Sequence, residues 1–377
     1  MKFLLIYVPN LRFKKFNNNW SRTTISKVCV CNPKNEDKLD DEFIYIDLES
    51  VEKGVLKSKN IIHLKNAPSR AQRILYKNDI LFQSVRPYQR NNYLLNEDDD
   101  FLQYVASTGY IQLRTTLNPY FLFQLLNTDK INNEVMLRCT GTSYPAINSN
   151  DFSNILITIT NDRNEQNKIA KFFSLIEERI QTQIKIINDY KILKNHIIKS
   201  FIKQNGTSYL LSEIAELGRG RVINSAEISK QKNPIYPVYS SQTSNNGIMG
   251  YLDNYDYEGE YITWTTDGAN AGTVYYRNGK FNCTNVCGIL KIKNGYDAYY
   301  ISNILNCYTK KYVSTNLANP KLMNNVMANI KINLPSIEQQ KHSSKILQSI
   351  EYRVEIEEDI KLNLVKQKAF LLKNMFI

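Results

Sequence analysis

Two stretches of the chain share one pattern of apolar and polar positions. The first begins at Asp162 and the second at Ser336, and in both the apolar residues recur every three or four positions. This spacing is typical of an amphipathic helix with a narrow, coiled-coil-like stripe. Each pattern is long enough for a helix of roughly 40 residues, or about 60 Å. Because such a helix outruns a small domain, we predict a helix–helix spacer rather than two helices that pack only on their own domains.

The stripe residues are the expected contacts between the two helices. They are Ile169, Phe173, Ile176, Ile180 and Ile187 in the first helix, and Ile346, Ile350, Val354, Ile360 and Leu364 in the second. The opposite faces carry charged side chains, which would meet partner proteins or water. The spacing does not decide between these two.

Both helices begin with the same local signal. Asp162 is followed three positions later by Glu165, and Ser336 by Gln339. In such a capping box the first side chain accepts from a free N–H of the first helical turn, and the later one accepts from the N–H of the capping residue. The signal predicts where each helix starts.

The repeat extends beyond the helices, which matters because internal repeats decide the architecture. The similar segments begin at Trp20 and Tyr209, Asn78 and Gly259, Ser107 and Asn285, Asn118 and Asp297, and Tyr144 and Asn319. The alignment places Gly109 over Gly288 and Pro145 over Pro320. The pair at Asn118 and Asp297 reads as a short, aromatic-rich helix. The chain is therefore one unit written twice, a mixed module followed by a long helix.

These patterns predict an α+β fold with two modules in tandem. The modules span 1–160 and 206–335, and the helices that follow them span 161–205 and 336–377. A chain of 377 residues with 42% hydrophobic residues is long enough for each module to bury a core.

The charge of the chain narrows its partners. The net charge is +12, which favours a polyanion such as nucleic acid or an acidic membrane, although a basic solvated surface is the alternative. No stretch is long and apolar enough for a transmembrane helix. The six cysteines form no paired CxxC pattern, and Cys29 with Cys31 is only a weak metal signal. We expect reduced thiols, no bound metal and a cytoplasmic location.

Motifs for catalysis are missing. The sequence has no GxxxxGK[ST] loop for a nucleotide phosphate and no GxSxG nucleophile elbow. The closest string to an amino-methyltransferase loop is Asn118-Pro-Tyr, which lacks the second proline. The Glu36-Asp-Lys string has the letters of a nuclease site but lies in a charged, loop-like run. The sequence thus predicts a protein that is not an enzyme.

The order of these segments resembles one family. The opening "VPNLRFKKFNNNW", two diverged modules, an "EQ…KIA" helix after the first and an "EQQ…KIL" helix after the second together resemble the specificity subunit of type I restriction–modification systems. The resemblance covers essentially the whole chain. One departure is "KHSSKIL" in the second helix, where "KKIAEIL" is expected, so His342 and Ser343 soften its apolar face.

The resemblance implies a function and partners. It implies two target-recognition domains that each read half of a bipartite site in double-stranded DNA, and two helices paired as an antiparallel coiled coil with pseudo-two-fold symmetry. Two methyltransferase subunits would dock on this scaffold, and translocase–nuclease restriction subunits would join them. S-adenosylmethionine, ATP and Mg²⁺ would be bound by those partners, with no cofactor on this chain.

In the first module, basic and amide side chains follow a predicted strand. Arg86, Gln89 and Arg90 are the main candidates, and Arg70 and Arg73 are further ones. Arg suits guanine O6 and N7, and Gln suits adenine N6 and N7. The alternative is a basic loop that only contacts phosphate.

In the second module, the candidates are mostly short polar side chains. Ser240, Ser241, Gln242 and Thr243 form one cluster, and Thr265, Thr266, Asp267 and Asn270 form another. They suit direct or water-bridged contacts with base edges, although turn capping is the alternative. Arg219, Arg221, Lys310 and Lys311 are candidate phosphate contacts. Trp264 is expected in the core.

Two other functions stay open at this stage. One is a stand-alone sequence-specific DNA-binding protein such as a repressor, and the other is a two-lobed scaffold that binds proteins. The long spacer disfavours the first. Salt-dependent DNA affinity would exclude the second, because phosphate contacts make log affinity fall linearly with log salt.

Overall fold

The computed structural model describes residues 8–96, 101–314 and 319–377. The chain divides into two compact units: Met1–Ile184 together with Asp359–Ile377, and Lys185–Glu358. Each long helix therefore contributes its first part to one unit and its remainder to the other. Among the described residues, no helix combines the length and apolar character needed to cross a membrane.

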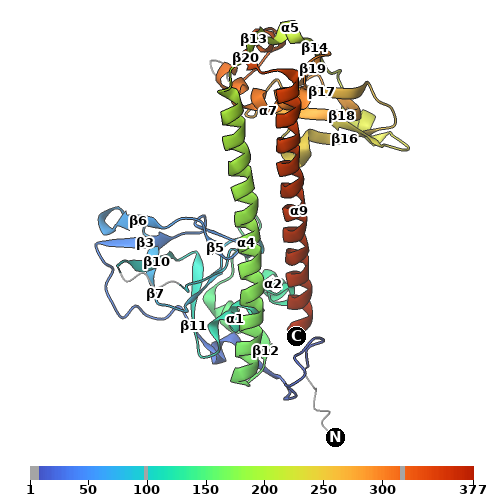
Figure 1. The fold of residues 1–377 in the computed structure, drawn as a ribbon. Coiled ribbons are helices and arrows are strands. Elements are labelled where there is room, and N and C mark those ends of the chain that lie inside the picture. Colours follow the sequence, from blue (N-terminus) through green and yellow to red (C-terminus); the bar gives the residue numbers. More distant parts are fainter. Residues whose placement is uncertain (1–7, 97–100, 315–318) are drawn as a thin grey trace. The chain divides into compact units, whose positions relative to one another are not determined.

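The first unit contains two four-stranded sheets and two two-stranded sheets (Figure 1). Its strands are β1 (Ser21–Thr24), β2 (Cys29–Cys31), β3 (Glu42–Ile46), β4 (Val51–Glu52), β5 (Val55–Leu56), β6 (Asn60–His63), β7 (Ala71–Leu75), β8 (Ile80–Gln83), β9 (Tyr93–Leu94), β10 (Gln103–Ser107), β11 (Tyr110–Thr115) and β12 (Leu156–Ile159). The sheets have the orders β6-β3-β10-β7, β2-β11-β8-β9 and β4-β5, and β1 pairs with β12. Its helices are α1 (Pro119–Leu126), α2 (Asp129–Met136), α3 (Ser149–Ser153) and the first part of α4 (Arg163–Ile202).

The second unit is built on a six-stranded sheet of order β14-β19-β17-β18-β15-β16. Its strands are β13 (Thr207–Leu210), β14 (Ala215–Arg219), β15 (Tyr236–Tyr239), β16 (Ile248–Leu252), β17 (Tyr257–Thr265), β18 (Val274–Cys283), β19 (Cys287–Ile292) and β20 (Lys331–Leu334). Its helices are α5 (Leu211–Ile214), α6 (Ser225–Ser229), α7 (Ala298–Tyr308), α8 (Asn324–Ala328) and the first part of α9 (Ile337–Met375). The α+β fold class is thus confirmed.

The strand before each long helix pairs with an early strand of the same unit. Ser21 lies opposite Ile159 in the β1–β12 pair, and Thr207 lies opposite Leu334 in the β13–β20 pair. Both pairs are antiparallel. Ser21 therefore corresponds to Thr207, whereas the sequence alignment had placed it over Leu210. The repeat is real, but its register near the start is three residues away from the predicted one.

The two helix starts differ in one respect from the prediction. At α9 both halves of the capping box are present, because the Gln339 N–H donates to Ser336 Oγ (3.4 Å) and the Ser336 N–H donates to Gln339 Oε1 (3.2 Å). At α4 only Asp162 caps, through the N–H groups of Asn164 (2.9 Å) and Glu165 (3.3 Å).

Glu165 does not reach back to the capping residue, as the sequence had predicted. Its buried carboxylate accepts from Arg12 Nε (2.6 Å) and Nη2 (2.8 Å) instead. A bidentate guanidinium is a stronger partner than one backbone N–H. The ion pair raises the pKa of Arg12, and it ties the N-terminal segment to the first turn of α4.

A second glutamine contact recurs at both helix starts. Gln166 Nε2 donates to the Thr160 carbonyl (2.9 Å), and its Oε1 accepts from the Asn118 N–H (2.9 Å). Gln340 Nε2 donates to the Pro335 carbonyl (2.8 Å), and its Oε1 accepts from the Asp297 N–H (3.1 Å).

Asn118 and Asp297 are the N-caps of α1 and α7. Each buried glutamine therefore links the start of a long helix to the start of a short one. We call this contact the glutamine clamp.

Within each unit, the parts of α4 and α9 run antiparallel. In the first unit, Lys368 forms an ion pair with Glu177, and the rings of Phe173 and Phe376 pack 5.9 Å apart. In the second unit, Lys191 Nζ lies 2.7 Å from Glu358, and Lys194 pairs with Glu351. Residue numbers thus rise along α4 as they fall along α9.

The predicted stripe is only partly the buried face. Ile169, Phe173, Ile180, Ile187 and Leu364 are buried, whereas Ile176, Ile346, Ile350 and Val354 are half-buried. Ile360 is 39% exposed, which differs from the prediction.

The buried row of α9 passes through other residues. Ser343, Ser344, Leu347 and Glu357 are buried, and Ser344 Oγ donates to Asp297 (2.7 Å). The two serines of the "HSS" departure are therefore buried, and Ser344 contacts the start of α7, whereas His342 is exposed and does not lie on the buried face as the sequence had predicted. Sequence periodicity missed this phase because serine and glutamate were counted as polar, and hence as outward-facing.

Candidate nucleic-acid interface

The same turn follows β8 in the first unit and β17 in the second. The Ser84 N–H and hydroxyl both donate to the Gly109 carbonyl (3.0 and 2.7 Å), and the Arg86 N–H donates to the Pro145 carbonyl (2.8 Å). The Thr266 N–H and hydroxyl both donate to the Val286 carbonyl (3.0 Å each), and the Gly268 N–H donates to the Pro320 carbonyl (3.0 Å).

A further pair of hydrogen bonds, made by the residues two positions after Pro145 and Pro320, is also equivalent in the two units. Ile147 donates to the Ser84 carbonyl (3.0 Å), and Leu322 donates to the Thr266 carbonyl (2.9 Å). Ser84 therefore corresponds to Thr266, and Arg86 corresponds to Gly268. We call these segments the first and second recognition turns, 84–91 and 266–271.

The strand alignment needs one correction here. Gly109 corresponds to Val286, and the predicted match of Gly109 with Gly288 is wrong by two residues. Pairing within the sheets shows why: Phe82 lies opposite Ile111, and Trp264 lies opposite Gly288. A Cβ on Gly288 would lie 2.1 Å from the Trp264 ring. Gly288 leaves room for the completely buried indole of Trp264. Gly109 has no such role, because the residue opposite Phe82 is Ile111.

A buried amide holds the first recognition turn from inside. Gln83 is completely buried; its Nε2 donates to the Val85 carbonyl (2.9 Å) and to Gln89 Oε1 (2.8 Å), and its Oε1 accepts from the Asn91 N–H (2.9 Å). The N–H of Gln83 donates to buried Asn92 (2.8 Å). Sequence reasoning missed Gln83, although a glutamine inside the apolar run "ILFQS" is an unusual strand residue.

The turn itself is a single 3₁₀ turn, Pro87–Gln89, between two arginines in the left-handed conformation. Arg86 has φ 54° and Arg90 has φ 55°. Arg90 Nη2 lies 2.8 Å from Asp129, and the Arg86 guanidinium lies over the exposed ring of Tyr144, 4.3 Å from its centroid. The first recognition turn thus brings together three of the predicted residues, Arg86, Gln89 and Arg90.

Arg70 and Arg73 belong to the segment that precedes β8 and contacts the strand next to the first recognition turn. Arg70 is exposed, and its carbonyl accepts from the Thr108 N–H (2.9 Å), beside the Gly109 that binds Ser84. Arg73 is half-buried in β7, burial lowers the pKa of its guanidinium, and Nε has no hydrogen-bond partner among the described residues.

The two predicted clusters of the second module meet in one hollow of about 440 Å³. Its lining includes Ser240, Ser241, Gln242, Asp267 and Asn270. Asn270 Nδ2 also donates to Thr243 Oγ1 (3.1 Å), which joins the two clusters directly.

Thr265 and Thr266 lie behind this hollow and not on its surface. Both are completely buried, and their hydroxyls donate to the carbonyls of Asn270 and Val286. They hold the second recognition turn from inside.

Lys310 is exposed, but its ammonium donates to the Ala271 carbonyl (2.9 Å), and Lys311 lies 4.7 Å from the ring centroid of Tyr308.

Asp267 is the charged centre of the second recognition turn. Its carboxylate lies 4.0 Å from Arg219 and 3.7 Å from Lys321. At the equivalent place the first turn has Val85, paired with Ala146 in the same kind of bridge. The two turns therefore share a backbone but present different side chains.

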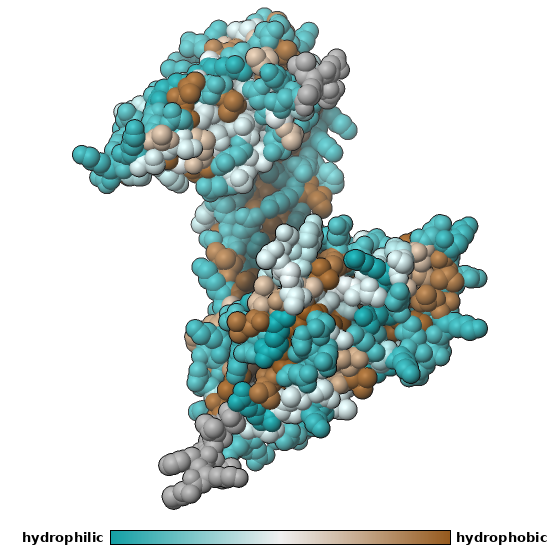
Figure 2. Space-filling model, turned by 180° about the vertical axis from the view of Figure 1, so that it is seen from behind, coloured by the Kyte–Doolittle hydropathy of each residue, from teal (hydrophilic) through white to brown (hydrophobic). Residues whose placement is uncertain are grey.

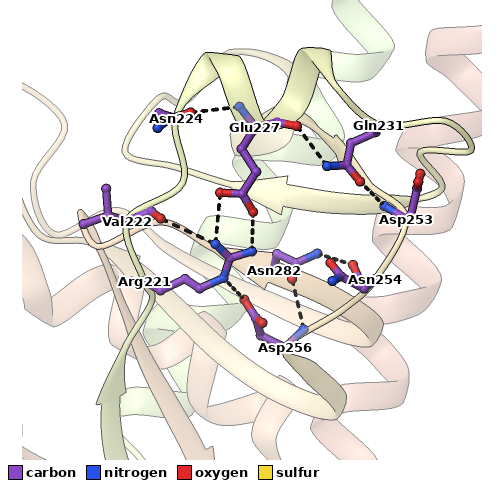
Figure 3. Close-up of polar contacts among 9 residues, drawn as sticks. All are labelled: Arg221, Val222, Asn224, Glu227, Gln231, Asp253, Asn254, Asp256 and Asn282. Carbon is purple, nitrogen blue, oxygen red and sulfur yellow. Dashed lines mark hydrogen bonds and ion pairs between the residues drawn. The ribbon is translucent and has the colours of Figure 1, made fainter.

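Arg221 is engaged elsewhere in the second unit (Figure 3). Its guanidinium binds Glu227 through Nη2 (2.6 Å) and Nη1 (3.1 Å), and Asp256 through Nε (3.0 Å). The hydrogen bond from Arg221 lowers the pKa of Glu227. Asn224 caps α6 beside it, so the predicted phosphate contact is, in this structure, the centre of an ion-pair cluster that anchors α6.

Arg277 is a residue that the sequence did not single out. It is 4% exposed and lies between the rings of Tyr239 and Tyr275, 3.5 and 4.4 Å from their centroids. Its Nη2 donates to the Asn246 carbonyl (2.9 Å), in a segment where Asn245, Asn246 and Gly247 all have positive φ. Arg277 therefore fixes the wall of the hollow that contains Ser240 and Gln242.

Comparison with known proteins identifies the family. A family model described as the type I restriction modification DNA specificity domain matches residues 205–367. A Mycoplasma pneumoniae protein described as the N-terminus of a proposed type I specificity subunit is 43% identical over 142 residues, which are 37% of this chain and 75% of that protein. The chain belongs to the type I specificity subunit family.

Other members of the family agree with this assignment. The specificity subunit of the type I restriction enzyme MpnII from M. pneumoniae is 42% identical over 146 residues, which are 38% of this chain and 43% of that protein. The crystal structure of a type I restriction–modification S subunit from M. genitalium has the same fold, with a TM-score of 0.64 over 98% of this chain and 99% of that one, at 18% identity. This chain and that S subunit thus share one fold over nearly their whole lengths.

Proposed function

We propose that this chain supplies the DNA sequence specificity of a type I restriction–modification complex. The two modules, 1–160 and 206–335, each read one half of a bipartite site in double-stranded DNA, and the helices in 161–205 and 336–377 set the distance between the halves. The repeated recognition turn supports this proposal best: one backbone design occurs twice with different side chains, as expected for two readers of different sequences.

The charge and the exposed polar groups fit this role. A net charge of +12 favours a polyanion, and Arg70, Arg86 and Arg219 lie near the two turns. Short polar side chains line the hollow of the second turn, where they suit contacts with base edges. The target would place the protein in the cytoplasm with the DNA.

We further propose that the chain has no catalytic role of its own. Methyltransferase subunits would carry S-adenosylmethionine, and restriction subunits would carry ATP and Mg²⁺. The helices of the first unit offer a groove of about 580 Å³. Its lining combines the apolar side chains of Phe172, Leu175, Ile176 and Leu364 with the polar ones of Glu178, Arg179, Thr182 and Gln183. Figure 2 shows hydrophobic residues among hydrophilic ones on one face of the molecule. This groove is the surface on which we expect a methyltransferase subunit to dock.

The decisive experiment is a methylome. The chain is expressed with a type I methyltransferase subunit that associates with it, in a host free of other DNA methylation, and modified adenines are mapped across the genome. We expect a split motif, with two short half-sites around a fixed gap, only when both proteins are present. A complex that forms with an active methyltransferase but modifies no split motif would contradict the proposal.

The other two functions have their own outcomes. A stand-alone repressor would bind one site tightly without any partner, which a DNA-binding selection with the purified chain would detect. A protein-binding scaffold would show no salt-dependent DNA affinity at all.

A further inference from the structure

The first recognition turn contains a side chain at a position where a side chain is unfavourable. Arg86 has φ 54°, and its counterpart in the second turn is Gly268 with φ 92°. The left-handed region is strained for residues with a Cβ and is natural for glycine. Because glycine serves the same turn in the second unit, the backbone alone does not explain Arg86. Strain of this kind is found where a side chain has a function.

In the part of the chain that the structure describes, the guanidinium of Arg86 stacks on one aromatic ring and has no acidic partner. It lies 4.3 Å from the ring centroid of Tyr144, which is 64% exposed. Within the described residues, no carboxylate or carbonyl accepts a hydrogen bond from it. Stacking on an aromatic face holds the planar guanidinium in one orientation and leaves its N–H donors at the edge.

The other candidates of this turn are occupied. Arg90 has the same backbone conformation, but its guanidinium binds Asp129 at 2.8 Å. Gln89 Oε1 accepts from the buried Gln83, so only its Nε2 remains for another partner. An adenine contact by Gln89 would need both the oxygen and the nitrogen. Of the three predicted residues in this described turn, Arg86 is therefore the one whose side chain remains available for a two-donor contact.

We propose that Arg86 specifies a guanine in the first half-site through a two-donor contact with O6 and N7, and that Tyr144 positions its guanidinium. This inference rests on the proposed function. It names the two residues that determine one base of the first half-site. The fixed fork of an arginine matches these two acceptors in the major groove. The buried contacts of Gln83 and Asn92 keep the turn in place before DNA binds.

The test uses variants of the full chain in the methyltransferase complex. Arg86→Gly copies the second turn and keeps the backbone, so the turn should fold. We expect one guanine position of the first half-site to become degenerate, with preference for guanine falling about 5- to 150-fold. The second half-site should not change. Tyr144→Ala should give a smaller loss at the same position, and Tyr144→Phe should keep the motif.

Lys53→Gly is the matched control. It removes the same charge from the same left-handed backbone conformation (φ 47°) at an exposed position of the first unit outside the recognition turn, and it should leave the identity of every base in the motif unchanged. The half-site that belongs to the first module is identified by exchange of residues 206–335, which should alter only the other half.

The outcomes separate this inference from the proposed function. A split motif that lacks guanine in the first half-site, or one that Arg86→Gly leaves intact, would overturn the role of Arg86 while the proposed function stands. Equal erosion of the whole first half-site by Arg86→Gly and Lys53→Gly would show an effect of folding or of net charge and also overturn it. Absence of any split motif for the unmodified chain would remove both.

Discussion

Buried charge is the main feature at the scale of single residues. Arg277 has no carboxylate partner among the described residues, and burial lowers the pKa of its guanidinium. Tyrosine rings and two oxygen acceptors, the Asn246 carbonyl and Thr263 Oγ1 (3.2 Å), compensate for lost hydration. Arg221, in contrast, stays partly exposed and binds two carboxylates. The first arginine orders a candidate recognition segment, and the second anchors α6.

The Arg221 cluster predicts a pH dependence. Because Arg221 lowers the pKa of Glu227, the ionised carboxylate stabilises the fold above its ordinary pKa, and this contribution disappears as the pH falls through the lowered value. Glu227→Gln should therefore lower the free energy of unfolding by up to about 1 kcal/mol near pH 7. The difference in stability between the variant and the unmodified chain should shrink as the pH falls below the ordinary pKa of a glutamate carboxyl.

Urea titrations at several pH values measure this difference. Asn224→Ala, which removes the cap of the same helix without changing a charge, is the control, because its effect should not vary with pH. A constant gap between Glu227→Gln and the unmodified chain would contradict the prediction.

At the scale of elements, the glutamine clamp links two helix starts in each unit. Gln340 is 2% exposed and makes one hydrogen bond with each end of its amide. Gln340→Ala leaves the buried carbonyl of Pro335 and the half-buried N–H of Asp297 without this partner and should cost about 1–3 kcal/mol of stability. Thermal unfolding measures this loss. Gln339→Ala, which removes only the exposed capping contact one residue away, should cost about 1 kcal/mol or less. Equal losses would contradict the clamp.

The Trp264–Gly288 pair predicts a non-additive effect. Gly288→Ala puts a Cβ about 2.1 Å from the indole and should destabilise the second unit by about 1–3 kcal/mol or more. The first unit uses the smaller Phe82 opposite the larger Ile111. Trp264→Phe should therefore reduce the cost of Gly288→Ala, and a double-mutant cycle in urea should show favourable coupling. Simple additivity would mean that the two residues do not share the space.

The sequence predicted the long helices accurately and the register of the strands less accurately. The helices begin within one residue of the predicted caps, because periodicity and capping are local signals. The register of the β1–β12 and β13–β20 pairs and the Arg12–Glu165 ion pair depend on partners more than 100 positions away, which no local pattern shows. The left-handed backbone of Arg86 was equally invisible, since only the structural match with Gly268 exposes it.

At the scale of the whole molecule, the two modules should be exchangeable. Replacing residues 206–335 with those of another family member should change one half-site and leave the other half-site and the gap unchanged, because α4 and α9 are kept. Methylome sequencing of the chimera measures this. A change in both half-sites would mean that the modules do not read DNA independently.

The glutamine clamp has a consequence for how new specificities arise. The clamp requires from its module only two backbone groups, the N–H of the capping residue of α1 or α7 and the carbonyl of the last module residue, Thr160 or Pro335. Asn and Asp both serve as the capping residue. A crossover between genes that falls at the start of α4 or α9 therefore brings in a foreign module without any matching change in the glutamine. Recombination can therefore exchange a whole module in a single event, while the two long helices are inherited intact.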